Sequence, residues 1–361
     1  MRRYVLALCP LLLAVGCRHA NLPDLPASHG HLSDALERYV DDSGRIRDPD
    51  AAPWSSLFEE DPEVAVEPHQ APAIFREATE ALSGKPTAEQ TRQAVDDLKA
   101  TCLSGLLESC VFLRENYKLP TLSNGALPDF PKGVLRKQLH TAGVVSCRLG
   151  VEGLFRDCSV LEGGVEGVAE ALLDFARRAR FHPATVAGHP IDIPYTFQVK
   201  FSPARPGVPM PQVLPEDQRL QWARARAAHA PASPMAWGSL AMQLARMAPE
   251  DPWYRQALRH AQELSPGAWW AANELAWLQV EEGRYADAAP LATRARAISP
   301  GNPYVLETFA AVLAGTNQCE QAVSEQRRAV AALPKEWPAP ERERFTRALE
   351  AYQRGCPATP V

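Results

Sequence analysis

The hydrophobic pattern changes its period several times along the chain. Apolar residues recur at helical spacing over about 73–120, and two strand-like alternating runs follow at 143–150 and 154–161. A helical stripe then leads to a third alternating run at 195–201, and from 216 to 356 the period is helical again. The pattern predicts an α+β multidomain chain. A small antiparallel sheet with one helix lies between a short helical segment and a C-terminal all-α solenoid.

The start of the chain has the pattern of a bacterial lipoprotein signal. Arg2 and Arg3 precede an apolar stretch of 13 residues, which ends just before Cys17. Such a helix is too short to cross a bilayer, so we predict a cleaved signal peptide over 1–16. The residues Ala14-Val15-Gly16-Cys17 resemble a lipobox, which implies lipidation of Cys17. The alternative is a plain secretory signal with a cysteine there by chance.

The expected location is the bacterial cell envelope, lipid-anchored and facing the periplasm. Arg18 follows the lipidated cysteine, whereas Asp is the residue that retains lipoproteins at the inner membrane in the best-known sorting rule. We therefore favour the outer membrane. The formal net charge of −5 argues against a nucleic-acid-binding protein.

The chain has 33 prolines among 361 residues, about twice the usual share, which predicts linkers and abrupt helix ends. The predicted order is a signal peptide (1–16), an acidic and proline-rich tether (17–72), a helical segment (73–120), a sheet module (128–203), a proline-rich linker (204–215) and helical repeats (216–356).

Six cysteines beyond Cys17 fall into three close pairs: Cys102 with Cys110, Cys147 with Cys158, and Cys319 with Cys356. In an oxidising compartment this pattern predicts three local disulfides. Zinc binding is the alternative, although no spacing typical of a zinc site supports it. Residues eight apart on one straight helix lie beyond the reach of a disulfide. We therefore expect a turn near Gly105 between the first pair.

The second cysteine pair fits a β-hairpin. If Glu152 and Gly153 form a two-residue loop, the numbers of facing residues sum to 305, and Cys147 faces Cys158. An ordinary buried thiol pair is the alternative to a disulfide across this hairpin.

The order strand, strand, helix, strand resembles the C-terminal domain of TonB-family energy transducers over about 128–203. The matching pieces are Asp129-Phe130-Pro131, Gly143-Val144-Val145, the Gly153 turn, Cys158-Ser159-Val160-Leu161, Ala179-Arg180-Phe181-His182-Pro183-Ala184, Gly188 and the strand 195–201. The resemblance implies a small antiparallel sheet with one helix, and an edge that pairs with an extended peptide. The chain lacks the transducers' N-terminal membrane helix, so the resemblance does not imply energy transduction.

The C-terminal part repeats. Pro266, Pro300 and Pro334 are spaced by 34 residues, which is the period of tetratricopeptide repeats. Residues between them resemble that family's consensus over about 234–355: Leu275, Ala276, Gly283, Tyr285, Ala288 and Ala295 in one unit, and Phe309, Ala310, Ala322 and Ala329 in the next. The resemblance implies three helical hairpins, with a final capping helix over 342–352.

We therefore expect an interaction or scaffold protein that binds peptide segments of cell-envelope proteins. The candidate sheet edge comprises Tyr195, Phe197, Gln198, Val199 and Phe201, and the candidate helical groove comprises Trp269 and Trp270. We expect the protein to contact the membrane through its lipid anchor, and we expect it to bind no nucleic acid, cofactor or metal. No catalytic motif is present, so we do not expect an enzyme.

Several alternatives remain open at this point. One alternative function is an accessory component of TonB-dependent transport across the outer membrane, and another is a hydrolase, which the tryptophan-rich repeats would allow. The alternative to a peptide-binding edge is that the 195–201 strand only completes the sheet. The alternative to a tryptophan-lined groove is that the tryptophans only pack between helices.

Overall fold

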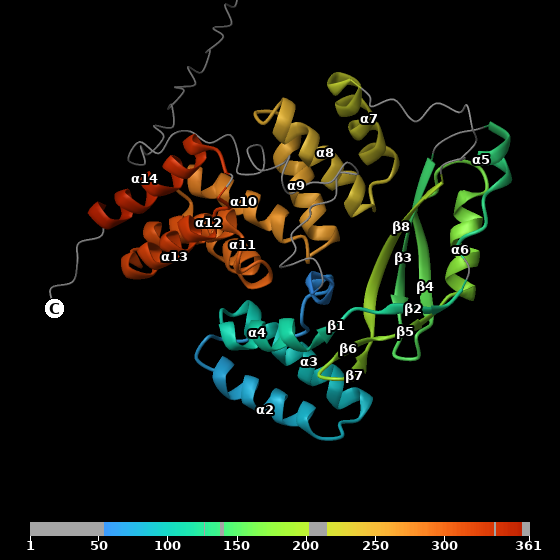
Figure 1. Cartoon of the computed structure of the whole chain (residues 1–361), viewed down its shortest axis with the longest axis horizontal. Coiled ribbons are helices and arrows are strands. Elements are labelled where there is room, and N and C mark those ends of the chain that lie inside the picture. The colour runs from blue at the N-terminus through green and yellow to red at the C-terminus, as the bar shows by residue number, and fades with distance from the viewer. Residues whose placement is uncertain (1–53, 126, 138–140, 202–214, 336, 356–361) are drawn as a thin grey trace, which may run out of the picture.

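The computed structural model describes residues 54–125, 127–137, 141–201, 215–335 and 337–355, and it is α+β. Figure 1 shows the N-terminal helices and the repeat helices lying one above the other, with the sheet to one side of both. The N-terminal elements are η1 (Ser55–Phe58), α2 (Ala71–Ser83), α3 (Ala88–Leu103) and α4 (Leu107–Asn116).

Thr87 and Gln90 form a capping box that begins α3, since each side chain accepts a hydrogen bond from the other residue's backbone N–H.

The predicted turn between the first cysteine pair is present. Gly105 has a φ of +101° between α3 and α4, a conformation that glycine adopts without strain. The turn brings Cys102 and Cys110 to a Cα–Cα distance of 4.8 Å, and the two are disulfide-bonded.

The main sheet has three antiparallel strands in the order β4-β3-β8. They are β3 (Thr141–Leu149), β4 (Phe155–Glu162) and β8 (Ile193–Phe201). Helix α6 (Val168–Arg178) covers one face, where Val168 and Leu172 pack against Val145 and Phe201. The short helix α5 (Lys132–Lys137) precedes the sheet. The main sheet and its helix therefore have the predicted chain order of strand, strand, helix and strand, with three short additional strands between α6 and β8.

The β3–β4 loop differs from the expected two-residue turn. The Gly150 N–H donates to the Leu154 carbonyl at 3.0 Å, so the loop has three residues, and Gly153 has the positive φ that such a loop requires. The residue numbers of facing positions near the turn therefore sum to 304, as for Leu149 and Phe155. A register shift near Asp157, whose φ is +50°, restores the sum of 305 at Val145 and Val160. Cys147 and Cys158 are disulfide-bonded across this irregularity.

Five short strands were not predicted. They are β1 (Tyr117–Lys118), β2 (Thr121–Asn124), β5 (Arg180–His182), β6 (Ala184–Val186) and β7 (His189–Ile191). β1 pairs with β6 and β2 pairs with β5, so the chain directly after α4 adds its backbone to the region after α6. The N-terminal helical segment is thus joined to the sheet module by strand pairing.

The C-terminal region is helical: α7 (Glu216–His229), α8 (Pro234–Met247), α9 (Pro252–Leu264), α10 (Trp269–Glu281), α11 (Tyr285–Ile298), α12 (Pro303–Gly315), α13 (Cys319–Ala332) and α14 (Ala339–Gly355). α8–α9, α10–α11 and α12–α13 are packed hairpins. Pro266, Pro300 and Pro334 each lie two residues beyond a hairpin's second helix. Small residues permit close crossing, because a Cβ on Gly315 would lie 2.1 Å from the Tyr285 ring.

The predicted tether over 17–72 ends earlier than expected, because Trp54, Leu57 and Phe58 are buried. One apolar core contains Trp54 and Phe58 together with residues of the N-terminal helices, the sheet module and the repeats, including Leu98, Leu149, Trp269 and Ile298. The three regions therefore pack against one another through shared apolar contacts.

Candidate peptide-binding pocket

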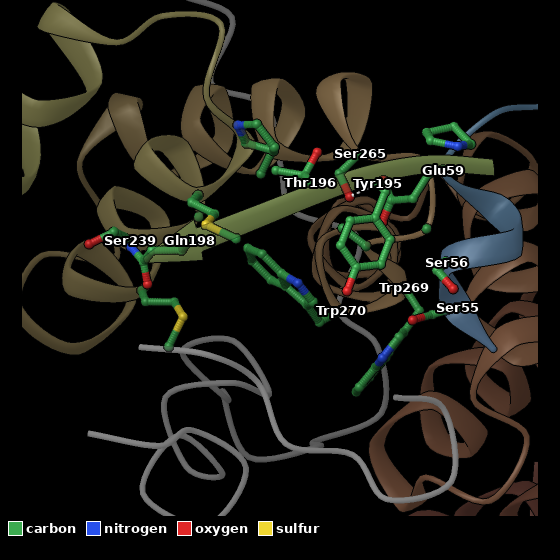
Figure 2. A pocket seen from close by; sticks show the side chains of 18 of the residues that line it. Ser55, Ser56, Glu59, Tyr195, Thr196, Gln198, Ser239, Ser265, Trp269 and Trp270 are labelled. Atoms are coloured by element: carbon green, nitrogen blue, oxygen red, sulfur yellow. Dashed lines mark hydrogen bonds between the residues drawn. The ribbon is translucent and has the colours of Figure 1, made fainter. Parts of the chain in front are cut away.

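A cavity of about 460 Å³ lies between the sheet and the repeat helices. Residues from η1 and the first half of β8 line it on the sheet side, and residues from α7, α8, α9 and the start of α10 line it on the helical side. Figure 2 shows β8 crossing the cavity, with Tyr195 and Trp270 pointing into it from opposite walls. The predicted sheet edge and the predicted helical groove therefore meet at one pocket.

β8 is an edge strand. Among the described residues it has one paired strand, β3, so alternate residues of β8 present their N–H and C=O groups away from β3. Thr196 and Gln198 line the pocket, and the Thr196 hydroxyl donates to Ser146 Oγ at 3.1 Å on the sheet face that α6 does not cover. The pocket thus adjoins a strand that has no second paired strand among the described residues, and η1 packs beside that strand.

The five predicted edge residues divide into two groups. Tyr195 and Gln198 line the pocket, although the Tyr195 ring also packs against the rings of Phe155, Phe181 and Phe197. Phe197, Val199 and Phe201 instead pack beneath α6, and Phe197 meets the Phe175 ring edge-on at a centroid distance of 5.7 Å. The side chains of these three therefore belong to the core, and only their backbone is available at the edge.

The opposite wall comes from α8 and α10. Met235, Gly238 and Ser239 of α8 line the cavity beside Trp270. A Cβ on Gly238 would lie 3.3 Å from the Trp270 ring, so the ring rests directly on the helix backbone. Sequence reasoning missed the α8 residues, because small and thioether side chains on a helix give no distinctive signal.

The two predicted groove tryptophans have different environments. Trp269 is 6% exposed and belongs to the shared core, although it also borders the pocket. Trp270 is half-buried and forms part of the wall. Neither indole N–H, nor the Tyr195 hydroxyl, has a hydrogen-bond partner among the described residues, so three donors at the cavity are available to a ligand.

A hydrogen-bonded ion pair holds the helical wall to the sheet. Arg226 at the end of α7 donates two N–H groups to Glu162 at the end of β4, at 2.7 and 2.8 Å. The Ser233 hydroxyl, just before α8, donates to the same carboxylate at 2.6 Å. Both charged side chains are mostly buried. This network fixes the position of α8 opposite β8.

Glu59 supplies the carboxylate of the pocket. It follows η1, is half-buried, and accepts a hydrogen bond from the Ser265 hydroxyl at 2.7 Å. Burial raises the pKa of the Glu59 carboxyl, and the Ser265 bond lowers it to a lesser degree. A signal for this segment exists in the sequence, since Trp54, Leu57 and Phe58 have helical spacing within the acidic stretch.

Other predicted sites lie partly outside the described residues. These include the lipidation site Cys17 and Cys356, the expected partner of Cys319. Within the described ranges, no cluster of three or more His, Cys, Asp or Glu side chains is arranged to hold a metal ion. No helix in those ranges combines the length and apolar character that a membrane span requires.

Comparisons with known proteins add little. No family model matches the chain, and no curated protein matches it. Among solved structures the chain is similar to the "MamA RS-1 ArsTM double mutant", with 14% identity over 38% of this chain and 85% of that chain, and a TM-score of 0.30. A likeness at that score carries no functional argument. The elements of the C-terminal region themselves show packed helical hairpins.

Proposed function

We propose that this protein is a non-catalytic adaptor that holds an extended segment of a cell-envelope protein in the pocket between β8 and α8. The observation that carries the proposal is the shared cavity: an edge strand with one partner opens onto a wall of thioether and aromatic side chains. No cofactor or metal is needed for this activity.

Strand addition suits this geometry. A peptide that pairs with the outer edge of β8 would exchange backbone hydrogen bonds with it, and these contacts are independent of peptide sequence. Its side chains would alternate between the sheet side and the α8 side, where Met235 and Trp270 offer adaptable and rigid apolar surface. The free donors at Tyr195 and the tryptophans would bind further carbonyl groups.

The proposed setting is the periplasmic side of the envelope, with Cys17 carrying the lipid and the outer membrane favoured. The resemblance of 128–203 to the C-terminal domain of TonB-family transducers supports peptide pairing at β8. The resemblance of 234–355 to tetratricopeptide repeats supports protein partners for the helical wall.

The test is to fill the pocket. Ser239 is half-buried on the α8 wall, so Ser239→Trp places a large ring in the cavity. We expect this variant to weaken binding of alternating Thr/Val peptides as long as β8, which has 9 residues, by about tenfold or more. Ser83→Trp, at an exposed position at the end of α2, is the matched control and should bind normally. Affinities would be measured by fluorescence anisotropy with full-length protein in detergent.

Equal binding by wild type and a folded Ser239→Trp variant would contradict the proposal. In the envelope, crosslinking of the same pair of variants separates the two settings. Selective loss of plug peptides of outer-membrane transporters would assign the protein to TonB-dependent transport, whereas selective loss of other envelope proteins would assign it to scaffolding.

A further inference from the structure

Glu59 differs from the acidic residues that follow it. Glu60 accepts from Arg148 at 2.6 Å, and Asp61 accepts from Arg294 at 2.5 Å, so both have a cation. Glu59 has no ion pair among the described residues, and its one side-chain bond comes from the neutral Ser265. It is nevertheless less exposed than Glu60. The acidic residue with the least access to water is therefore the one without a counter-charge.

The local backbone is shaped to admit this carboxylate. A Cβ on Gly267 would lie 2.5 Å from the Ser55 carbonyl oxygen and 3.0 Å from Glu59 Oε1. A side chain at 267 would thus displace η1 and Glu59 together. The glycine allows the connection from α9 to α10 to pass close behind the carboxylate, which leaves Glu59 at the edge of the pocket.

Among the described residues that line the cavity, no basic side chain is left to pair with Glu59. Arg226 is the one basic residue among the described residues that line it, and Glu162 accepts two hydrogen bonds from its guanidinium. A charge withdrawn from water without a partner costs free energy. That cost is recovered when a ligand brings the missing positive charge.

Aromatic rings stand around the same space. In Figure 2 the Tyr195 ring lies between Glu59 and the indoles of Trp269 and Trp270. The faces of such rings attract a cation, and the attraction is strongest where water is excluded. Because a carboxylate and aromatic faces border one cavity, its chemistry favours a positively charged group with an apolar stem over a neutral or acidic group.

We infer that the pocket selects peptides with a lysine or arginine side chain, whose charged end meets Glu59 and whose methylene stem lies against Tyr195 and Trp270. The inference rests on the proposed function, since the peptide backbone is held at β8. It specifies which side chain the strand must offer when it pairs there. A single basic residue at the position that faces Glu59 would set the register of the bound segment.

The experiment compares blocked alternating Thr/Val peptides that differ at one central position: Lys, Arg, Gln or Glu. We expect the Lys and Arg peptides to bind about tenfold more tightly than the Gln peptide, and the Glu peptide to bind weakest. Glu59→Gln keeps the acceptor for Ser265 and removes the charge, so it should bring the Lys-to-Gln ratio of affinities close to one. Thermal melting establishes that this variant is folded.

Glu67→Gln is the matched control, because Glu67 is exposed and lies outside the pocket lining. It removes the same charge and should retain the preference for Lys. Equal binding of the Lys and Gln peptides to wild type, with both weakened by Ser239→Trp, would overturn the inference and leave the proposed function standing. A preference for Lys that survives Glu59→Gln would also overturn it. Failure of every peptide to bind wild type would contradict both.

Discussion

The two edges of the main sheet are built differently. β8 pairs with β3 through nine consecutive residue pairs without a register shift. β4 pairs with β3 through an interrupted ladder, with irregularities between Val144 and Val145 and between Ser146 and Arg148. Asp157 on β4 has a positive φ, and Cys158 ties the strand to β3. One edge is regular, and the other is bent and crosslinked.

Under the proposed function, this difference separates the edge that accepts a strand from the edge that does not. Bulges and charged side chains are common means by which proteins prevent unwanted pairing at sheet edges. β4 has both, since Arg156 and Asp157 are exposed beside the bulge. β8 also has an exposed charge, Lys200, but its ladder is regular and its first half borders the cavity. The proposed function therefore requires that β4 does not pair with a peptide while β8 does.

The largest expected effect comes from breaking the crosslink of the β4 edge. The double variant Cys147→Ser/Cys158→Ser should lower the free energy of unfolding by about 3 kcal/mol, because the unfolded chain regains the entropy of the opened loop. Urea unfolding measures the loss. Amide exchange should accelerate in β4, while peptide affinity at β8 stays within about twofold.

Cys102→Ser/Cys110→Ser is the control, since its sequence separation of 8 is close to the 11 of the other pair. It should cost a similar amount of stability and leave β4 exchange unchanged. Loss of peptide binding in a folded Cys147→Ser/Cys158→Ser variant would contradict the division of roles between the two edges.

The sequence was sufficient for local features of these edges. Alternation predicts the three strands of the main sheet, and the assumed loop at Glu152 and Gly153 predicts the observed pairing of Val145 with Val160. The predicted length of the loop was wrong by one residue. A three-residue loop followed by a bulge at Asp157 gives the same pairing of Val145 with Val160 as a two-residue loop without a bulge. Two compensating irregularities leave no trace in the spacing.

The pocket itself could not be predicted, since its walls lie far apart in the chain. Edge residue Gln198 and groove residue Trp270 were both candidates, but for two separate modules. Their meeting depends on tertiary contacts such as Arg226 with Glu162, which no periodicity encodes. Trp269 and Trp270 looked equivalent, and only the packing of η1 and the repeats assigns one to the core and the other to the wall.

Removing the ion pair that joins β4 to the helical wall should have a smaller effect on stability than removing the disulfide. Arg226→Met leaves Glu162 mostly buried with the Ser233 hydroxyl as a neutral donor, and should lower the free energy of unfolding by about 2 kcal/mol. Peptide affinity should also fall severalfold, because α8 loses its fixed position opposite β8. Urea unfolding and anisotropy measure the two effects.

Arg177→Met on α6 is the matched control, since its ion pair with Asp174 is exposed and 3.5 Å long. It should change stability by less than about 0.5 kcal/mol. An Arg226→Met variant as stable as this control would show that the ion pair does not hold the pocket together.

The smallest effect concerns the β8 side alone and depends on pH. Because burial raises the pKa of Glu59, the folded protein binds a proton more readily than the unfolded chain, and stability falls as pH rises from the ordinary carboxyl range through the raised pKa. Glu59→Gln lacks this loss, so it should gain stability over wild type near neutral pH and little of that gain should remain near about pH 4. Ser265 and Tyr195 are the polar groups that face Glu59 from the other walls, and neither changes charge in this range.

Urea unfolding at the two pH values measures the difference in stability. Glu67→Gln is the control variant, and its stability relative to wild type should not change between the two pH values. A less stable Glu59→Gln protein at neutral pH would mean that the carboxylate is already compensated, and that β8 opens onto a pocket with no unmet charge.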